Sequence, residues 1–111
     1  MTLDEYQIQA TETAVYPQRR TDVGLAYTFL GLGGEVGELL QILKRVMRDR
    51  GGPATPEDYA KIRDELGDCL WYLALAADEI GLRLSDVAAR NLDKLADRQA
   101  RGVLHGEGGQ R

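Results

Sequence analysis

Hydrophobic positions recur every three or four residues along most of the chain, which is the spacing of one face of an α-helix. Segments in which apolar β-branched residues alternate with polar ones, as in strands, are absent from the sequence. The spacing predicts four helices, over about residues 3–14, 22–49, 56–80 and 86–101. Because the connections between them are short, we expect an all-α fold in which neighbouring helices pack as an antiparallel helical bundle.

Capping residues and helix breakers set the expected boundaries. Thr2, Thr55 and Ser85 each precede a helical pattern as an N-cap, and Pro56 occupies the first helical position of the third helix. The expected breaks are Tyr16-Pro17, Gly51-Gly52-Pro53, Gly81 and Gly102. The sequence therefore predicts one domain over residues 1–101, followed by a flexible, glycine-rich C-terminal tail over residues 102–111.

One pattern occurs twice, on two different expected helices. The segments "EVGELLQIL" and "ELGDCLWYL" share the form E-[VL]-G-[ED]-x-L-x-x-L. Residues three apart on a helix lie about 60° apart on one face, so each copy places two acids beside its apolar stripe. The four acids are Glu35, Glu38, Glu65 and Asp68. If the two helices pack antiparallel through their stripes, these carboxylates come together.

Four adjacent carboxylates repel one another unless protons or cations separate them. Carboxylate oxygens suit Mg²⁺, with Mn²⁺ as a possible substitute, and Mg²⁺ in proteins commonly also binds substrate phosphates. A di-iron bundle would need Glu-x-x-His pairs, but the one histidine, His105, belongs to the tail. The acids therefore favour a metal site for a phosphate-bearing substrate, although a single E-x-x-E pair is also typical of a solvated helix face.

The last expected helix offers groups that complement phosphates. Asn91, Lys94 and Arg98 follow i, i+3, i+7 spacing and share one face. Lysine and arginine bind phosphate, and asparagine can hydrogen-bond a sugar or a phosphate. Taken without the acids, this face is more typical of solvated surface than of a binding site.

Composition and charge exclude several classes of protein. The 111 residues are 43% hydrophobic, carry a formal net charge of −4 and have a pI near 4.9, which argues against a nucleic-acid polymer as partner. The longest apolar run is too short to cross a membrane, and the acidic N-terminus does not resemble a signal peptide. One cysteine, Cys69, lies in an apolar stripe and is expected in the core of a cytoplasmic protein.

The glycines of "GLGGEVGELLQILKR" do not form a dinucleotide-binding loop. The required spacing would need glycine at position 36, which is Val36, and no strand precedes the segment. We expect these glycines to permit close packing instead. Gly31 and Gly34 lie on the acidic side of the helix, where a missing side chain leaves room for a ligand or another helix. Gly37 and Gly67 occupy equivalent positions in the two copies of the repeat.

Four segments together resemble the MazG-like nucleotide pyrophosphohydrolases of the all-α NTP pyrophosphatase superfamily. They are "YQIQATETAVYP", "LGLGGEVGELLQILKR", "RDELGDCLWYLALAADEIGL" and "ARNLDKLADR". The resemblance implies a helical bundle that forms a homodimer or homotetramer and cleaves nucleoside triphosphates to a monophosphate and pyrophosphate with Mg²⁺. After Arg98 the chain departs from many relatives, which have an aromatic-proline ending.

The resemblance also implies roles for individual residues. Glu35, Glu38, Glu65 and Asp68 would be metal ligands or position the attacking water, and Asn91, Lys94 and Arg98 would contact the nucleotide and its phosphates. Tyr16, Arg19 and Tyr27 are candidates for base recognition. Two other functions stay open from the sequence: hydrolysis of phosphoribosyl-ATP, and a non-catalytic helical interaction module.

Overall fold

The computed structural model describes residues 1–104, and these residues contain four α-helices, one short π-helix and no strand. The elements are α1 (Leu3–Thr11), α2 (Asp22–Arg45), η1 (Val46–Arg50), α3 (Pro56–Glu79) and α4 (Leu84–Ala100). The prediction of an all-α fold with four main helices is confirmed. Residues 105–111, which include His105 and most of the expected tail, lie outside the described residues.

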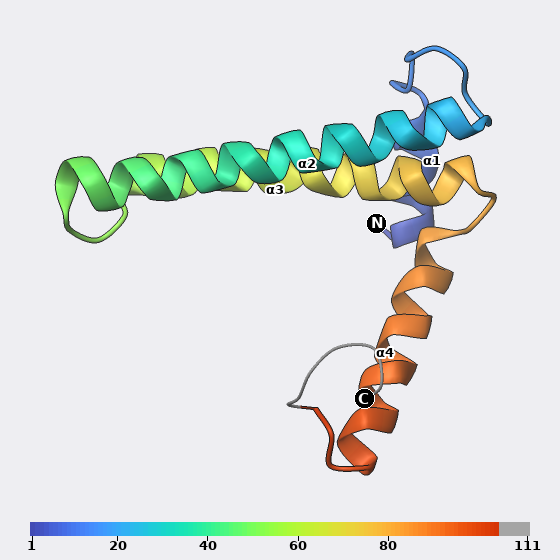
Figure 1. Cartoon of the computed structure of the whole chain (residues 1–111). Helices are drawn as coiled ribbons and strands as arrows, with labels where there is room; N and C mark the ends of the chain where they lie inside the picture. The colour runs from blue at the N-terminus through green and yellow to red at the C-terminus, as the bar shows by residue number, and fades with distance from the viewer. Residues whose placement is uncertain (105–111) are drawn as a thin grey trace.

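The helices α2 and α3 form a long antiparallel hairpin, and η1 lies at its tip (Figure 1). The helix α1 packs across the other end of the hairpin, where it contacts α3 and α4. From that end α4 projects away from the hairpin, and within the described residues it makes no contact with α2. A single chain therefore builds the antiparallel central pair of the expected bundle but leaves the bundle open beside α4.

The helix starts show which capping predictions hold. Thr2 accepts a hydrogen bond from the Glu5 N–H, and Thr55 forms a reciprocal capping box with Asp58. The prediction that Ser85 caps the last helix is wrong, because α4 already begins at Leu84. The Ser85 N–H and hydroxyl instead donate to the Asp4 carboxylate at 3.1 and 2.8 Å. A side chain of α1 thus satisfies the first turn of α4, which a local sequence pattern cannot reveal.

The described core is small and lies at the end of the hairpin where α1, α3 and α4 meet. Its buried residues are Ala10, Ala14, Tyr16, Ala74, Leu75 and Leu84. Cys69 is buried further along α3, as its apolar stripe predicts. Most large hydrophobic side chains along the rest of the hairpin remain exposed. No helix in the described part of the chain is long and apolar enough to cross a membrane.

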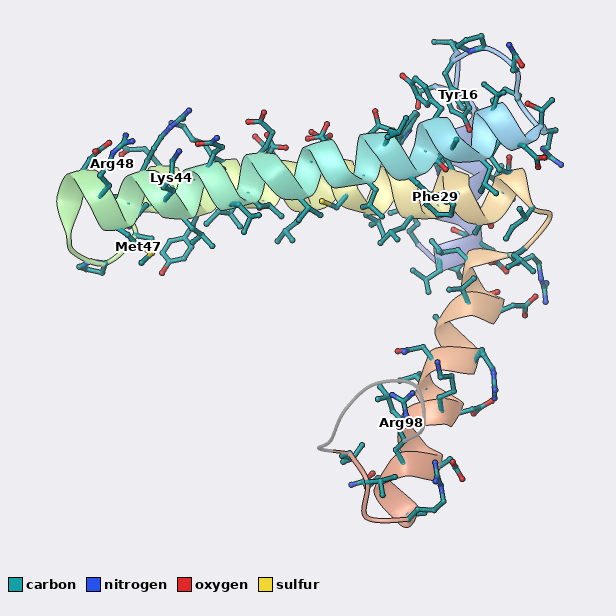
Figure 2. All side chains as sticks on the ribbon, viewed as in Figure 1. Tyr16, Phe29, Lys44, Met47, Arg48 and Arg98 are labelled. Carbon is teal, nitrogen blue, oxygen red and sulfur yellow. The ribbon has the colours of Figure 1, made fainter. Side chains whose placement is uncertain are left out.

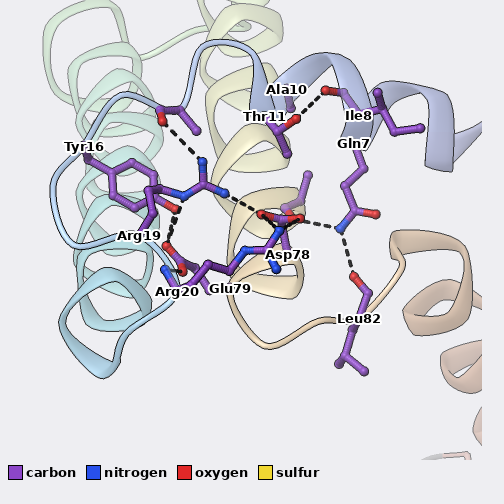
Figure 3. Close-up of polar contacts among 12 residues, drawn as sticks. Gln7, Ile8, Ala10, Thr11, Tyr16, Arg19, Arg20, Asp78, Glu79 and Leu82 are labelled. Atoms are coloured by element: carbon purple, nitrogen blue, oxygen red, sulfur yellow. Dashed lines mark hydrogen bonds and ion pairs between the residues drawn. The ribbon is translucent and has the colours of Figure 1, made fainter.

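A polar network fastens the segment between α1 and α2 to the end of α3 (Figure 3). The side chain of Glu79 is fully buried, and it accepts hydrogen bonds from the Tyr16 hydroxyl at 2.6 Å and the Arg20 backbone N–H at 2.5 Å. Arg19 pairs with the neighbouring carboxylate of Asp78. Gln18 and Arg20 have positive φ values of 57° and 65°, which non-glycine residues rarely adopt, so the network holds a strained connection in place.

We expect the replacement Glu79→Gln to lower the free energy of unfolding at pH 7 by about 2 kcal/mol. Burial by itself would raise the pKa of Glu79, but the Tyr16 and Arg20 hydrogen bonds and the charge of Arg19 outweigh it, so the pKa lies below its usual 4.5. This stabilisation is therefore present above pH 4.5 and is lost as the pH falls through the lowered pKa. Denaturant unfolding at pH 7 and near pH 3 would measure it.

The pH profile distinguishes this effect from a general loss of packing. The difference in the free energy of unfolding between the wild type and Glu79→Gln should become smaller in acid. The exposed control Glu12→Gln should have the same free energy of unfolding as the wild type at both pH values. A difference that stays constant from pH 7 to pH 3 would contradict an ionised Glu79 in the native state.

Candidate metal centre

The two copies of the repeated acidic pattern meet in the middle of the hairpin. Glu35 of α2 and Glu65 and Asp68 of α3 each offer a carboxylate oxygen, and these three oxygens lie within 4.8 Å of one another. Glu35 and Glu65 are half-buried, whereas Asp68 is exposed. Glu38 is exposed one turn further along α2 and does not belong to this group. The structure thus brings three of the four predicted acids together and places the fourth beside them.

The electrostatics of this group fit a bound cation. The pKa of Glu65 is raised because its protonated form can hydrogen-bond with Glu35, with further contributions from partial burial and from the negative charges of Glu35 and Asp64. The Oε2 atom of Glu65 is buried and has no hydrogen-bond partner within the described structure. An orphaned carboxylate oxygen that faces a second carboxylate is costly unless a proton or a metal ion compensates it. A hard divalent cation such as Mg²⁺ matches this all-oxygen donor set.

An aromatic side chain closes one side of the acid group. A Cβ atom at Gly31 would lie 2.2 Å from the ring of Tyr72, so only glycine at position 31 lets this ring pack on α2. Burial, Tyr27 and the charges of Glu35 and Asp68 together raise the pKa of the Tyr72 phenol. The expected close packing is therefore confirmed at Gly31, whose close neighbour is Tyr72. It is not found at Gly34, Gly37 and Gly67, where an added Cβ would meet no atom within 4 Å in the described structure.

Tyr72 belongs to a larger aromatic cluster at the α1 end of the hairpin. The rings of Tyr16 and Tyr27 stack with centroids 4.6 Å apart, and Trp71 packs edge-on to Tyr72 at 5.0 Å. Tyr72 is not among the candidate residues that the sequence pattern indicates. The signal that could have marked it is its position four residues after Asp68, one helical turn along the same face.

The predicted phosphate-binding face on α4 is not brought to the acids within one chain. Asn91 and Lys94 are exposed and line a hollow of about 570 Å³ along α4, and Asn91 also lines a second hollow with Leu70 and Leu73 of α3. Arg98 lies near the far end of α4, well away from the hairpin (Figure 2). In this conformation the three residues form a face of their own, so their role as nucleotide contacts stays a prediction.

Comparison with known families agrees with this arrangement. Residues 25–103 match the model of the MazG nucleotide pyrophosphohydrolase domain. The chain belongs to the MazG nucleotide pyrophosphohydrolase family. The matched part of this MazG protein includes both acidic motifs and nearly all of α2, together with α3 and α4 in full.

Comparisons with individual proteins and with solved structures add to the family assignment. The MazG chain is 42% identical over 114 residues to the Gene 37 protein of Mycobacterium phage L5, and the match covers the whole of both chains. No solved structure gives a significant match.

Proposed function

We propose that this MazG protein is a Mg²⁺-dependent hydrolase that cleaves ribo- or deoxyribonucleoside triphosphates into a monophosphate and pyrophosphate, as housekeeping of the cytoplasmic nucleotide pool. The observation that carries the proposal is the meeting of Glu35, Glu65 and Asp68 inside the matched family domain. Three carboxylates with an orphaned buried oxygen suit a divalent cation, and the family acts on nucleotides.

In this proposal each acid has a task. Glu35, Glu65 and Asp68 would hold the metal, and bound Mg²⁺ would neutralise the phosphate oxygens and the charge that develops on the leaving pyrophosphate. Glu38, exposed one turn away, would accept the proton of the attacking water. The water oxygen bonds to the α-phosphorus, the bond from that phosphorus to the bridging oxygen breaks, and pyrophosphate leaves.

We further propose that the working form is a homodimer or homotetramer. The Cα radius of gyration is 17.0 Å, whereas a compact domain of this length has about 13 Å. Among the core residues of the described part, Leu75 is the only large aliphatic side chain that is less than 2% exposed. An isolated chain of this shape buries too little apolar surface for a stable domain, so a second copy is the expected cover.

Two neighbouring surfaces are available to a second copy. One is the apolar face of the hairpin, opposite Arg48 and on the side of Met47 in Figure 2. Its exposed members are Val36, Leu40, Leu43, Met47, Tyr59, Leu66, Leu70 and Leu73. The other is a groove of about 500 Å³ in the elbow between α3 and α4, lined mainly by leucine side chains. In such an assembly, α4 of one copy could also reach the acids of another copy.

The direct test is the product released from a panel of nucleoside triphosphates, deoxynucleoside triphosphates and phosphoribosyl-ATP in the presence of Mg²⁺. We expect pyrophosphate and a nucleoside monophosphate, without orthophosphate, and no turnover after chelation of the metal. Turnover of phosphoribosyl-ATP alone would favour the related hydrolase. No turnover, together with no shift of the melting temperature on adding Mg²⁺, would favour a non-catalytic interaction module.

A further inference from the structure

The acid group has chemically different neighbours on its two sides along the hairpin. Towards the tip, Arg45 lies seven residues after Glu38, and two helical turns bring the two side chains to the same face of α2. On α3, Lys61 lies one turn before Glu65 in the same direction. Towards the other end lie the uncharged rings of Tyr72 and Tyr27. Cations therefore flank the acids on one side, and aromatic rings flank them on the other.

Arg45 is available to a ligand. Its side chain is exposed, and no ion pair or hydrogen bond joins it to another side chain in the described part of the protein. The next arginine along the chain, Arg48, is already engaged by Asp49 at 2.5 Å. The rise from Glu38 to Arg45 is about 10 Å along the helix axis, a distance that an extended triphosphate and a long arginine side chain can bridge.

The aromatic side offers a different kind of contact. Tyr27 is 42% exposed, and its ring is held by stacking on buried Tyr16. A ring fixed in this way loses little conformational entropy when a nucleobase stacks on it, and such stacking tolerates any base. An arginine side chain, in contrast, pairs strongly with phosphate oxygens.

We propose that the substrate lies along the hairpin with its phosphate tail towards the tip, so that Arg45 contacts the terminal phosphate and the base lies at Tyr27. The proposal rests on the proposed function, since it orients a nucleoside triphosphate whose α- and β-phosphates sit at the acids. It makes Arg45 a positioning residue that distinguishes triphosphates from diphosphates, because a diphosphate is one phosphate too short to reach it.

The test is calorimetric binding of non-hydrolysable α,β-methylene analogues, as triphosphate and as diphosphate, to the full-length protein with Mg²⁺. We expect Arg45→Ala to weaken binding of the triphosphate about five- to tenfold and to leave the diphosphate unchanged, with Arg45→Lys in between. The exposed control Arg63→Ala, two residues before Glu65 and therefore on a different face of α3, should change neither. Tyr27→Leu should weaken both analogues by the same factor.

The outcomes separate this proposal from the proposed function. If the wild type releases pyrophosphate but Arg45→Ala weakens both analogues equally, or neither, the orientation is wrong and the function stands. If Tyr27→Leu selectively weakens the triphosphate, the phosphate tail points the other way and the proposal is overturned. If the wild type binds neither analogue and releases no pyrophosphate, both proposals are wrong.

Discussion

Replacement of Glu35 by glutamine is expected to lower the rate of pyrophosphate release at least about a thousandfold, which corresponds to about 4 kcal/mol of transition-state stabilisation. Glu35 is the α2 member of the three-carboxylate group, and it faces Glu65 across the hairpin. The amide is nearly the same size but carries no charge, so packing is preserved while the cation loses a ligand. Steady-state release of pyrophosphate at saturating Mg²⁺ measures the effect.

Thermal unfolding separates loss of the metal site from loss of the fold. Without metal, Glu35→Gln should melt at the same temperature as the wild type or higher, because the charge of Glu35, which contributes to the raised pKa of Glu65, is gone. Addition of Mg²⁺ should raise the melting temperature of the wild type but not that of the variant. Glu57→Gln, an exposed acid in the first turn of α3, serves as the control for a lost charge. A fully active Glu35→Gln enzyme would rule out the proposed metal centre.

The sequence could predict that these acids meet because the information for it is local and repeated. Each acid pair is fixed by helical spacing within four residues, and the two copies need only an antiparallel hairpin to meet. The break at Gly51-Gly52-Pro53 and the capping box at Thr55 and Asp58 are equally local, and they define that hairpin. A feature that depends on neighbours within one or two helical turns can therefore be predicted from the sequence.

The sequence could not predict features that depend on side chains far apart along the chain. Asp4 satisfies the first turn of α4 from 81 positions away, which overrides the local signal of Ser85. Glu79 is buried and ionised only because Tyr16 and Arg19 reach it from another segment. The start of α4 is likewise held by Gln7 and Asp4 of α1, which accept hydrogen bonds from the Leu84 and Ser85 N–H groups. Spacing along α4 could therefore not show that its basic face lies away from the acids.

If the wild type forms the proposed oligomer, the replacement Leu73→Asp is expected to leave a monomer with a chain mass of 12.3 kDa. Leu73 is 47% exposed in the single chain, and it belongs both to the apolar face of the hairpin and to the groove in the elbow between α3 and α4. A second copy that covers this position would have to desolvate an unpaired carboxylate, which costs several kcal/mol. Light scattering coupled to size exclusion would report the mass.

The matched control is Val15→Asp, which introduces the same charge at an 89% exposed position outside both surfaces and should leave the oligomer intact. Loss of assembly should also lower the melting temperature, because the small core around Leu75 must then support the hairpin alone. If α4 of one copy serves the acids of another, the monomer should lose pyrophosphate release even while it remains helical. A Leu73→Asp protein that keeps the wild-type mass would show that copies do not associate through this face.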